Sequence, residues 1–307
     1  MLSPQKTARE SPLPRFILLL NFTPYSFLYL FLYFLSLISL LSISDFFTFW
    51  VIIELAILLF IGLCFSLFSL GFSRLIIYFL IQTISSFSLF ISFSLGFSRL
   101  IIYFLILKLS IFPFHTWFLS LVYRFPNFVI FLASTFHKLP SFLIFSLFVS
   151  SNSSFLIFSS LLTLLLSGSF MLISSDFRLL LVSSSIGNNS WFLLSSFYSS
   201  QLLLFFIFLY SLFLFFLISF LGLFSSLSLN RGVSFTFLLT LASISGFPPF
   251  PLFWVKLYVV YVSIQSLPPF FFFFFLLFAI LVLAGYFRFF FSKSVIFNSW
   301  EVSFKSN

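Results

Sequence analysis

The chain has 307 residues, of which 62% are hydrophobic, 25% aromatic and 6% charged, and its mean hydropathy is +1.28. A soluble domain needs a far more polar surface, so this composition excludes one and predicts an all-α polytopic membrane protein. The net charge of +9 does not indicate a nucleic-acid partner, because the 14 Lys and Arg residues are scattered singly rather than gathered in a basic stripe.

The apolar residues form continuous runs rather than an alternating pattern, which favours helices over a β-barrel. Each crossing needs about 20 apolar residues, so the chain has room for about 10 or 11 helices. The predicted crossings are Phe16–Leu41, Phe46–Leu67, Leu75–Phe93, Leu100–Phe114, Phe128–Val149, Phe155–Ile173, Leu179–Ser196, Leu202–Leu223, Phe235–Phe247, Phe250–Ile264 and Phe270–Phe291. This transmembrane domain (16–292) lies between polar tails at 1–15 and 293–307.

Two neighbouring crossings share one segment. FSLGFSRLIIYFLI occurs at residues 68–81 and again at 93–106. The 25-residue period corresponds to a helix about 37 Å long, close to one crossing plus a turn, so the copies are expected on successive helices of opposite direction. Two copies do not make a solenoid, and a local gene duplication is favoured over a functional repeat.

Four ionisable residues lie deep inside the apolar runs: Glu54, Lys108, Lys138 and Lys256. A charge at the bilayer centre costs about 3 kcal/mol, so such residues are expected to face a polar interior and to be functional. Lys138 precedes Pro140 by two residues, and Lys256 ends the segment GFPPFPLFWVK. Proline breaks helices, and ionisable groups on discontinuous helices are typical of transporters. Two discontinuous helices are therefore predicted.

These four residues carry one negative and three positive charges if all are ionised. Pairing cannot neutralise them all. Burial disfavours the ammonium form while a neighbouring carboxylate favours it, so at least one of the three lysines is expected to exchange a proton, as a proton relay requires. The alternative is that they are interfacial lysines or structural salt bridges. His137, beside Lys138, is as consistent with a packed polar residue as with a relay member.

Redox chemistry inside the chain is not expected. The single cysteine, Cys64, excludes a disulfide framework and a thiolate cluster. The two histidines, His115 and His137, are too few for a two-haem or haem–copper site. We therefore expect no metal and no bound cofactor in this chain.

Five stretches, in order between residues 50 and 256, resemble one family: WVIIELA, YFLIQ, KLSIFPFHTW, FHKLP and GFPPFPLFWVK. They are similar to segments of subunit 2 of the proton-pumping NADH:ubiquinone oxidoreductase, respiratory complex I, within the wider antiporter-like group. The third is the most specific, since the family reads K-x-G-x-x-P-F-H-x-W. The resemblance implies an antiporter-like fold in which Glu54 is the relay glutamate, Lys108 its partner, Lys138 the central lysine and Lys256 the terminal lysine.

The resemblance further implies a non-redox subunit, with NADH, FMN, iron–sulfur clusters and ubiquinone held in other subunits. Its partners would be the other membrane-arm subunits, including antiporter-like ones, and membrane lipids. Phe accounts for 60 residues, and its U-rich codons are typical of a T-rich organellar genome, which favours an organelle-encoded protein of the mitochondrial inner membrane. The alternatives are a stand-alone cation/proton antiporter and a degenerate structural subunit of the arm.

The chain departs from the family in places. The segment SSSIGNNSW resembles a stretch that usually reads SSIAHxGW, so Asn188 or Asn189 stands where histidine is common. A neutral amide binds water but carries no proton at pH 7, so this relay step is expected to differ here. Ser110 replaces the family glycine, and Pro140 comes one residue early. His115, His137 and Asn188 are the predicted accessory residues.

Overall fold

The computed structural model describes residues 24–43, 45–67, 72–148, 153–174, 176–224, 231–266 and 273–289. These ranges contain helices and turns and no strand, which confirms the predicted all-α class. Five described helices are long and apolar enough to cross a membrane, and shorter apolar helices accompany them. The chain is a multi-pass membrane protein. The polar tails predicted at 1–15 and 293–307 lie outside the described residues.

Most of the described helices begin and end within a few residues of a predicted crossing. Their bounds are α1 (Pro24–Ser39), α2 (Phe46–Leu67), α3 (Phe72–Ser94), α4 (Ser98–Leu109), α5 (Thr116–Val122), α6 (Asn127–Ser134), the 3-10 turn η2 (Phe136–Lys138), α7 (Leu139–Phe148), α8 (Ser153–Ile173), α9 (Phe177–Ser196), α10 (Ser200–Phe224), α11 (Arg231–Ser245), α12 (Pro251–Ser266) and a last helix, Phe273–Phe289.

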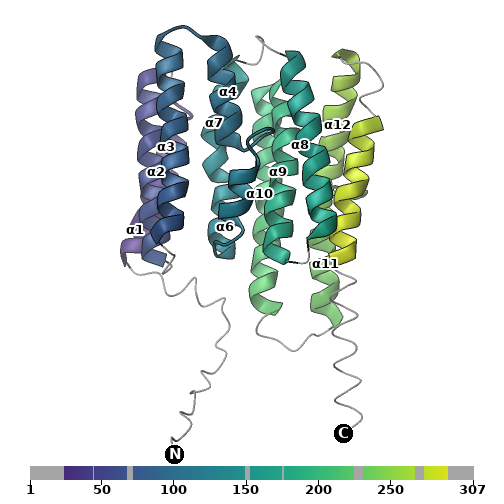
Figure 1. Ribbon diagram of the computed structural model, residues 1–307. Coiled ribbons are helices and arrows are strands. Elements are labelled where there is room, and N and C mark those ends of the chain that lie inside the picture. Colours follow the sequence, from purple (N-terminus) through teal and green to yellow (C-terminus); the bar gives the residue numbers. More distant parts are fainter. Residues whose placement is uncertain are drawn as a thin grey trace, which may run out of the picture.

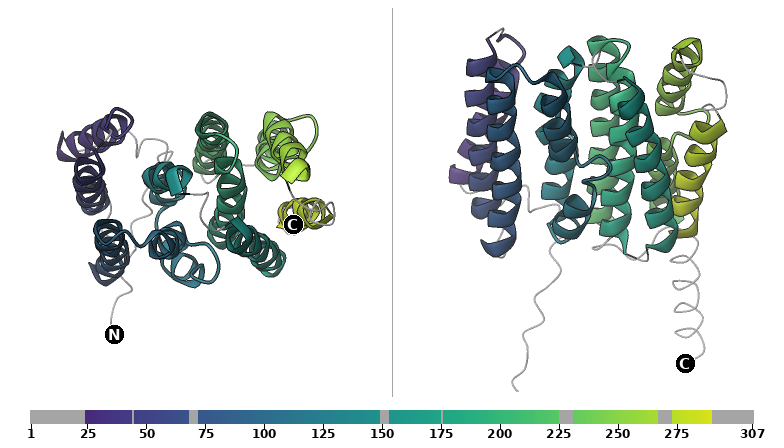
Figure 2. Two further views of the ribbon diagram at one scale, coloured as in Figure 1. Left: turned by 90° about the horizontal axis from the view of Figure 1, so that it is seen from above. Right: turned by 45° about the horizontal axis from the view of Figure 1, so that its top comes forward.

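The helices stand side by side as a bundle (Figure 1). Seen from above, they follow the order of the chain, from α1 at one end of the bundle to the last helix at the other (Figure 2). Glu54 is on α2 and Lys256 on α12. The chain order therefore places the predicted ionisable residues along the length of the bundle, with the lysines of α4 and η2 between its two ends.

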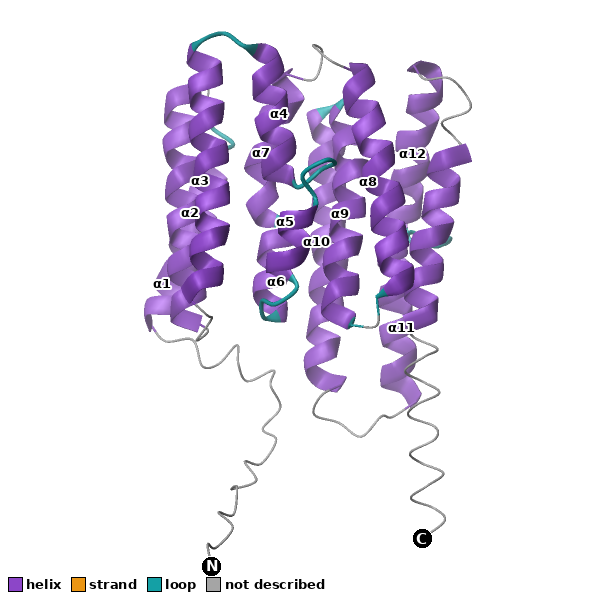
Figure 3. Cartoon of the chain, in the orientation of Figure 1, coloured by secondary structure: helices purple, strands orange, loops and turns teal. Residues whose placement is uncertain are grey.

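Three rods of the described bundle are broken near their middle. Figure 3 places α5 below α4, α6 below α7 and α11 below α12. The breaks at Thr135, between α6 and η2, and at Gly246, after α11, confirm the two predicted discontinuities. The segments predicted as separate crossings at 235–247 and 250–264 are thus two halves of one rod. The break between α4 and α5, directly after Lys108, was not predicted.

Serine side chains inside the helices bond to their own helix. Ser183, Ser184 and Ser185 of α9 each donate to the carbonyl three residues earlier, at 2.8–3.0 Å. A hydroxyl satisfied in this way adds little polarity to the helix surface, which allows a serine-rich helix to lie within a membrane.

The central helix α9 is surrounded by protein. Every residue from Leu180 to Ser196 is buried, and α9 packs against α5, α6, α7, α8, α10 and α12. By contrast α10 has an outer face of exposed Phe205, Phe208 and Phe215, which suits contact with lipid tails. Polar side chains on α9 therefore have only other protein groups or internal water as partners.

Ser110 ends α4 in the left-handed conformation, with φ 57° and ψ 41°. That conformation costs a side-chain-bearing residue about 1–2 kcal/mol and glycine almost nothing, which explains the glycine of the similar family segment. We expect Ser110→Gly to stabilise the protein by about 1 kcal/mol, measured by thermal unfolding in detergent. Ser185→Gly, in right-handed helix, is the control and should destabilise. An equal loss from both substitutions would contradict this account.

Candidate functional site

Glu54 lies half-buried on α2. Its carboxylate accepts a hydrogen bond from the Ser86 hydroxyl of α3, and the Trp50 indole N–H donates to the Ser86 carbonyl at 3.0 Å. Trp50 and Glu54 both line an open hollow of about 550 Å³ between α2 and α3, which Thr83 and Ser88 also line. Glu54 is therefore reachable from the side of the bundle, unlike the three lysines.

Lys108 lies at the lower end of the half-helix α4 and is only 4% exposed. Its Nζ has no hydrogen-bond partner, but Glu54 is close enough for the two charges to attract each other. The lysine borders a cavity of about 10 Å³ between α2, Pro140 and His137. That is about the space one water molecule needs, and a water there would supply the missing partner.

His137 faces the same cavity as Lys108. Its ring packs among Phe60 at 4.8 Å, Tyr78 at 5.7 Å and Tyr33 at 6.5 Å between ring centroids. Its Nε2 has no hydrogen-bond partner, nor do the buried hydroxyls of the two tyrosines. The charges of Lys108 and Lys138 both act on the ring. His137 thus sits near the two lysines, with an unpaired ring nitrogen available to water.

Lys138 points toward the central helix. Its Nζ donates to Asn189 Oδ1 at 3.2 Å and lies 3.9 Å from the centre of the Phe118 ring, a cation–π contact. The Asn189 Nδ2 donates in turn to the Leu109 carbonyl at 2.8 Å. Asn189 therefore joins Lys138 to the end of α4, one residue beyond Lys108. Of the two asparagines that the sequence left open, Asn189 is the one that contacts a lysine.

We expect Asn189→Leu to destabilise the protein by about 1–3 kcal/mol, because it leaves the Lys138 ammonium and the Leu109 carbonyl buried without partners. Thermal unfolding in detergent measures this loss. Asn188→Leu removes an amide of the same size from the next position, where no lysine depends on it, and should cost less. Equal losses from the two variants would show that the Asn189 contacts add nothing.

Lys256 is held at the break between α11 and α12. Its Nζ donates to the Ser245 carbonyl at 3.1 Å and lies 5.7 Å from the centre of the Trp191 ring. Ser245 is the last residue of α11, where the unpaired carbonyls form the negative end of the half-helix, so an ammonium is favoured there. Gly246 follows in the left-handed conformation with φ +81°.

The remaining predicted accessory residues lie elsewhere. His115 directly precedes α5, is buried, and has ring contacts with Phe112 and Phe170 rather than with an ionisable side chain. Asn188 lies beside Tyr210 of α10, a residue that the sequence analysis did not select. Among the described residues, no three His, Cys, Asp or Glu side chains gather into a group that could hold a metal ion.

No protein-family profile and no curated protein matches the sequence. Many solved structures match the fold, and two of them are described here. A chain of the Mrp complex from Dietzia sp. DQ12-45-1b aligns with a TM-score of 0.70 and 16% identity, over 83% of this chain and 57% of that one. The present chain shares the fold of that chain. A chain of respiratory complex I from Thermus thermophilus, solved with bound aureothin, aligns with a TM-score of 0.67 and 17% identity, over 88% and 79%.

These likenesses confirm, at the level of fold, the resemblance drawn from the sequence motifs. The chain spans little more than half the length of the Mrp chain that it matches.

Proposed function

We propose that the chain is a proton-translocating membrane-arm subunit of a respiratory complex I, in the place of subunit 2. The observation that supports this most is the position of the three buried lysines. Lys108 and Lys138 lie at helix breaks, and Lys256 donates a hydrogen bond to the carbonyl of Ser245, at the break between α11 and α12. Freed backbone groups at such breaks offer partners for an ammonium and for water at mid-depth of the membrane.

The proposed relay starts at Glu54 and passes through Lys108 and Lys138 to Lys256. Glu54 and Lys108 attract each other, and the charges of Lys108 and Lys138 both act on His137, so the protonation of each group depends on its neighbours. A change in the charge of Glu54 would therefore move protons along the bundle. The open hollow beside Glu54 gives this end of the relay a contact with its surroundings.

In this proposal the chain itself performs no redox step. NADH, FMN, iron–sulfur clusters and ubiquinone belong to other subunits, and the partners are the other membrane-arm subunits and lipids. The high Phe content favours the mitochondrial inner membrane as the location. His115 and His137 remain accessory candidates, and His137 has the better position because it shares a cavity with Lys108.

The test is Glu54→Gln in the assembled complex, reconstituted into vesicles, with proton uptake measured per NADH oxidised. The variant keeps the side-chain volume but removes the charge, so pumping should fall by about tenfold. Asp45→Asn, an exposed acid just before α2, is the matched control and should pump normally. Normal pumping stoichiometry in a fully assembled Glu54→Gln complex would contradict the proposed relay and would favour a purely structural role for the chain.

A second candidate is a stand-alone cation/proton antiporter, favoured by the fold shared with the Mrp chain. It predicts exchange of protons for Na⁺ or K⁺ by the isolated chain in liposomes without NADH. The proposed subunit should show no such flux alone and should copurify with a large NADH-oxidising assembly.

A further inference from the structure

A second buried polar cluster lies between α9, α10 and the last helix. It consists of Tyr210, Tyr286, Ser184 and Asn188. Both tyrosines are buried, with 0% and 2% of their surface exposed. The Tyr210 hydroxyl has loose polar contacts with Asn188 and Ser184, and the Tyr286 hydroxyl has one with Ser184, but none of these contacts has the geometry of a hydrogen bond. A buried hydroxyl without a partner costs about 1–3 kcal/mol. Phenylalanine would fill the same space without that cost, so packing alone does not account for these two oxygens.

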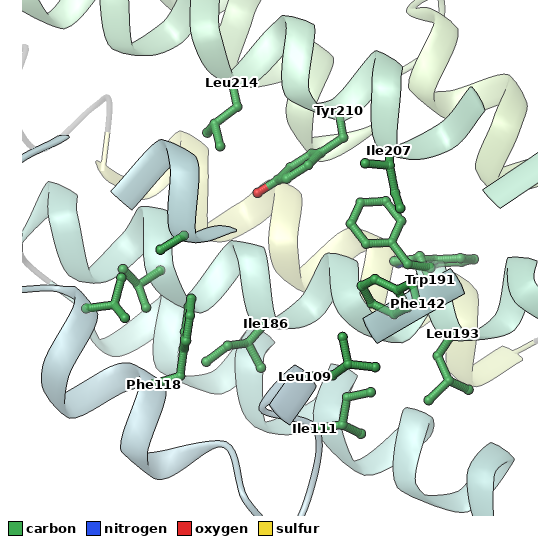
Figure 4. Close-up of a cluster of buried hydrophobic side chains, with 14 of the residues drawn as sticks. Leu109, Ile111, Phe118, Phe142, Ile186, Trp191, Leu193, Ile207, Tyr210 and Leu214 are labelled. Carbon is green, nitrogen blue, oxygen red and sulfur yellow. The ribbon is translucent and has the colours of Figure 1, made fainter. Parts of the chain in front are cut away.

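The cluster is continuous from side chain to side chain. The Tyr210 hydroxyl lies beside Asn188 and Ser184, and Tyr286 lies beside Ser184 and Tyr210. Figure 4 shows Tyr210 projecting from α10, between Leu214 and Ile207, toward α9. Its neighbour Asn188 directly precedes Asn189, which accepts the hydrogen bond of Lys138. The cluster and the central lysine therefore contact α9 at consecutive residues.

The other end of the cluster approaches Lys256. Tyr286 lines a cavity of about 10 Å³ together with Ser245, whose carbonyl accepts the hydrogen bond of Lys256 at 3.1 Å. A cavity of this size holds about one water molecule, and the Tyr286 hydroxyl and the Ser245 backbone are suitable partners for it. The two tyrosines thus connect Asn188, which is next to the partner of Lys138 in the chain, with the cavity beside Ser245, the partner of Lys256.

We propose that Tyr210 and Tyr286 carry protons between Lys138 and Lys256, with single waters completing the path. Each phenol oxygen accepts one proton as it releases its own to the next oxygen, so one O–H bond forms and one breaks, and the tyrosine stays neutral overall. Lys138 loses a proton and Lys256 gains one. Asn188 and Ser184 orient the Tyr210 hydroxyl and carry no proton themselves. The direction of net transfer depends on the function proposed above.

The test uses Tyr210→Phe, Tyr286→Phe and the double variant in the assembled complex in vesicles. Each substitution keeps the ring and removes only an oxygen whose contacts with the protein are loose, so assembly and thermal stability should change little. Proton pumping should nevertheless fall by about tenfold in each single variant. Because the two hydroxyls act in series, the double variant should be no slower than the slower single one. Tyr261→Phe, on the exposed face of α12, is the control.

Lys138→Met is measured alongside to separate the two proposals. If Lys138→Met stops pumping while both tyrosine variants pump normally, the tyrosine path is wrong and the lysine relay stands. If Lys138→Met itself pumps normally, the proposed function fails first. A loss of stability equal to the loss of pumping in the tyrosine variants would assign the hydroxyls a structural role and overturn the proposal.

Discussion

Replacement of Lys138 by methionine is expected to lower the proton-pumping rate of the assembled complex by about tenfold or more. Lys138 is in hydrogen-bond contact with α9, through Asn189 at 3.2 Å. Methionine has a similar length and keeps the contact with Phe118, but it can neither hold nor release a proton. Proton uptake per NADH oxidised in reconstituted vesicles measures the effect.

Two further substitutions sharpen this prediction. Lys138→Arg keeps a positive charge that does not deprotonate, so it should fold and assemble but still fail to pump. Arg124→Met removes an exposed positive charge from the turn between α5 and α6 and should pump normally. Normal pumping by Lys138→Arg would mean that the site needs only a fixed charge, and proton transfer through it would have to be abandoned.

Gly246→Ala is expected to impair both stability and pumping. Gly246 has φ +81°, a conformation that costs alanine about 1–2 kcal/mol. A Cβ atom there would lie 3.1 Å from Lys256 Cδ and 3.2 Å from its Nζ, so the lysine would have to move away from the Ser245 carbonyl. Thermal unfolding and vesicle pumping together measure the two effects.

The chain offers a matched control at Gly96, which has φ +73° but no atom within 4 Å of an added Cβ. Gly96→Ala should therefore lose a similar amount of stability without any loss of pumping. If Gly246→Ala and Gly96→Ala pump equally well, the position of the Lys256 ammonium at the break between α11 and α12 is unimportant for transport.

The main ionisable residues could be selected from the sequence because charges are rare in apolar runs. Lys108, Lys138 and Lys256 are indeed buried, while Glu54 is half-buried beside an open hollow. The break after Lys108 was missed because Ser110, not glycine, takes the left-handed turn. Whether Asn188 or Asn189 contacts Lys138 depends on which side of α9 faces η2. Because α9 is buried on all sides, its sequence has no amphipathic pattern from which that side could be predicted.

The tyrosine cluster carried no sequence signal. Tyr210 and Tyr286 are single residues on different helices, 76 positions apart in the chain, and each lies in an ordinary apolar run. Only the packing of α10 and the last helix against α9 brings their hydroxyls near Ser184. Their positions beside Asn188 and beside the cavity at Ser245 arise only in the assembled bundle.

Composition and the length of the apolar runs determined that this chain forms membrane helices, and approximately where each begins and ends. Which face of each helix is buried was decided only by the tertiary structure, and the repeated segment demonstrates it. Tyr78 of the first copy is fully buried, whereas Tyr103 at the same position of the second copy is 43% exposed. Leu80 is 47% exposed and its counterpart Leu105 is fully buried. A helix that is apolar all round has no preferred side, so its neighbours choose the face.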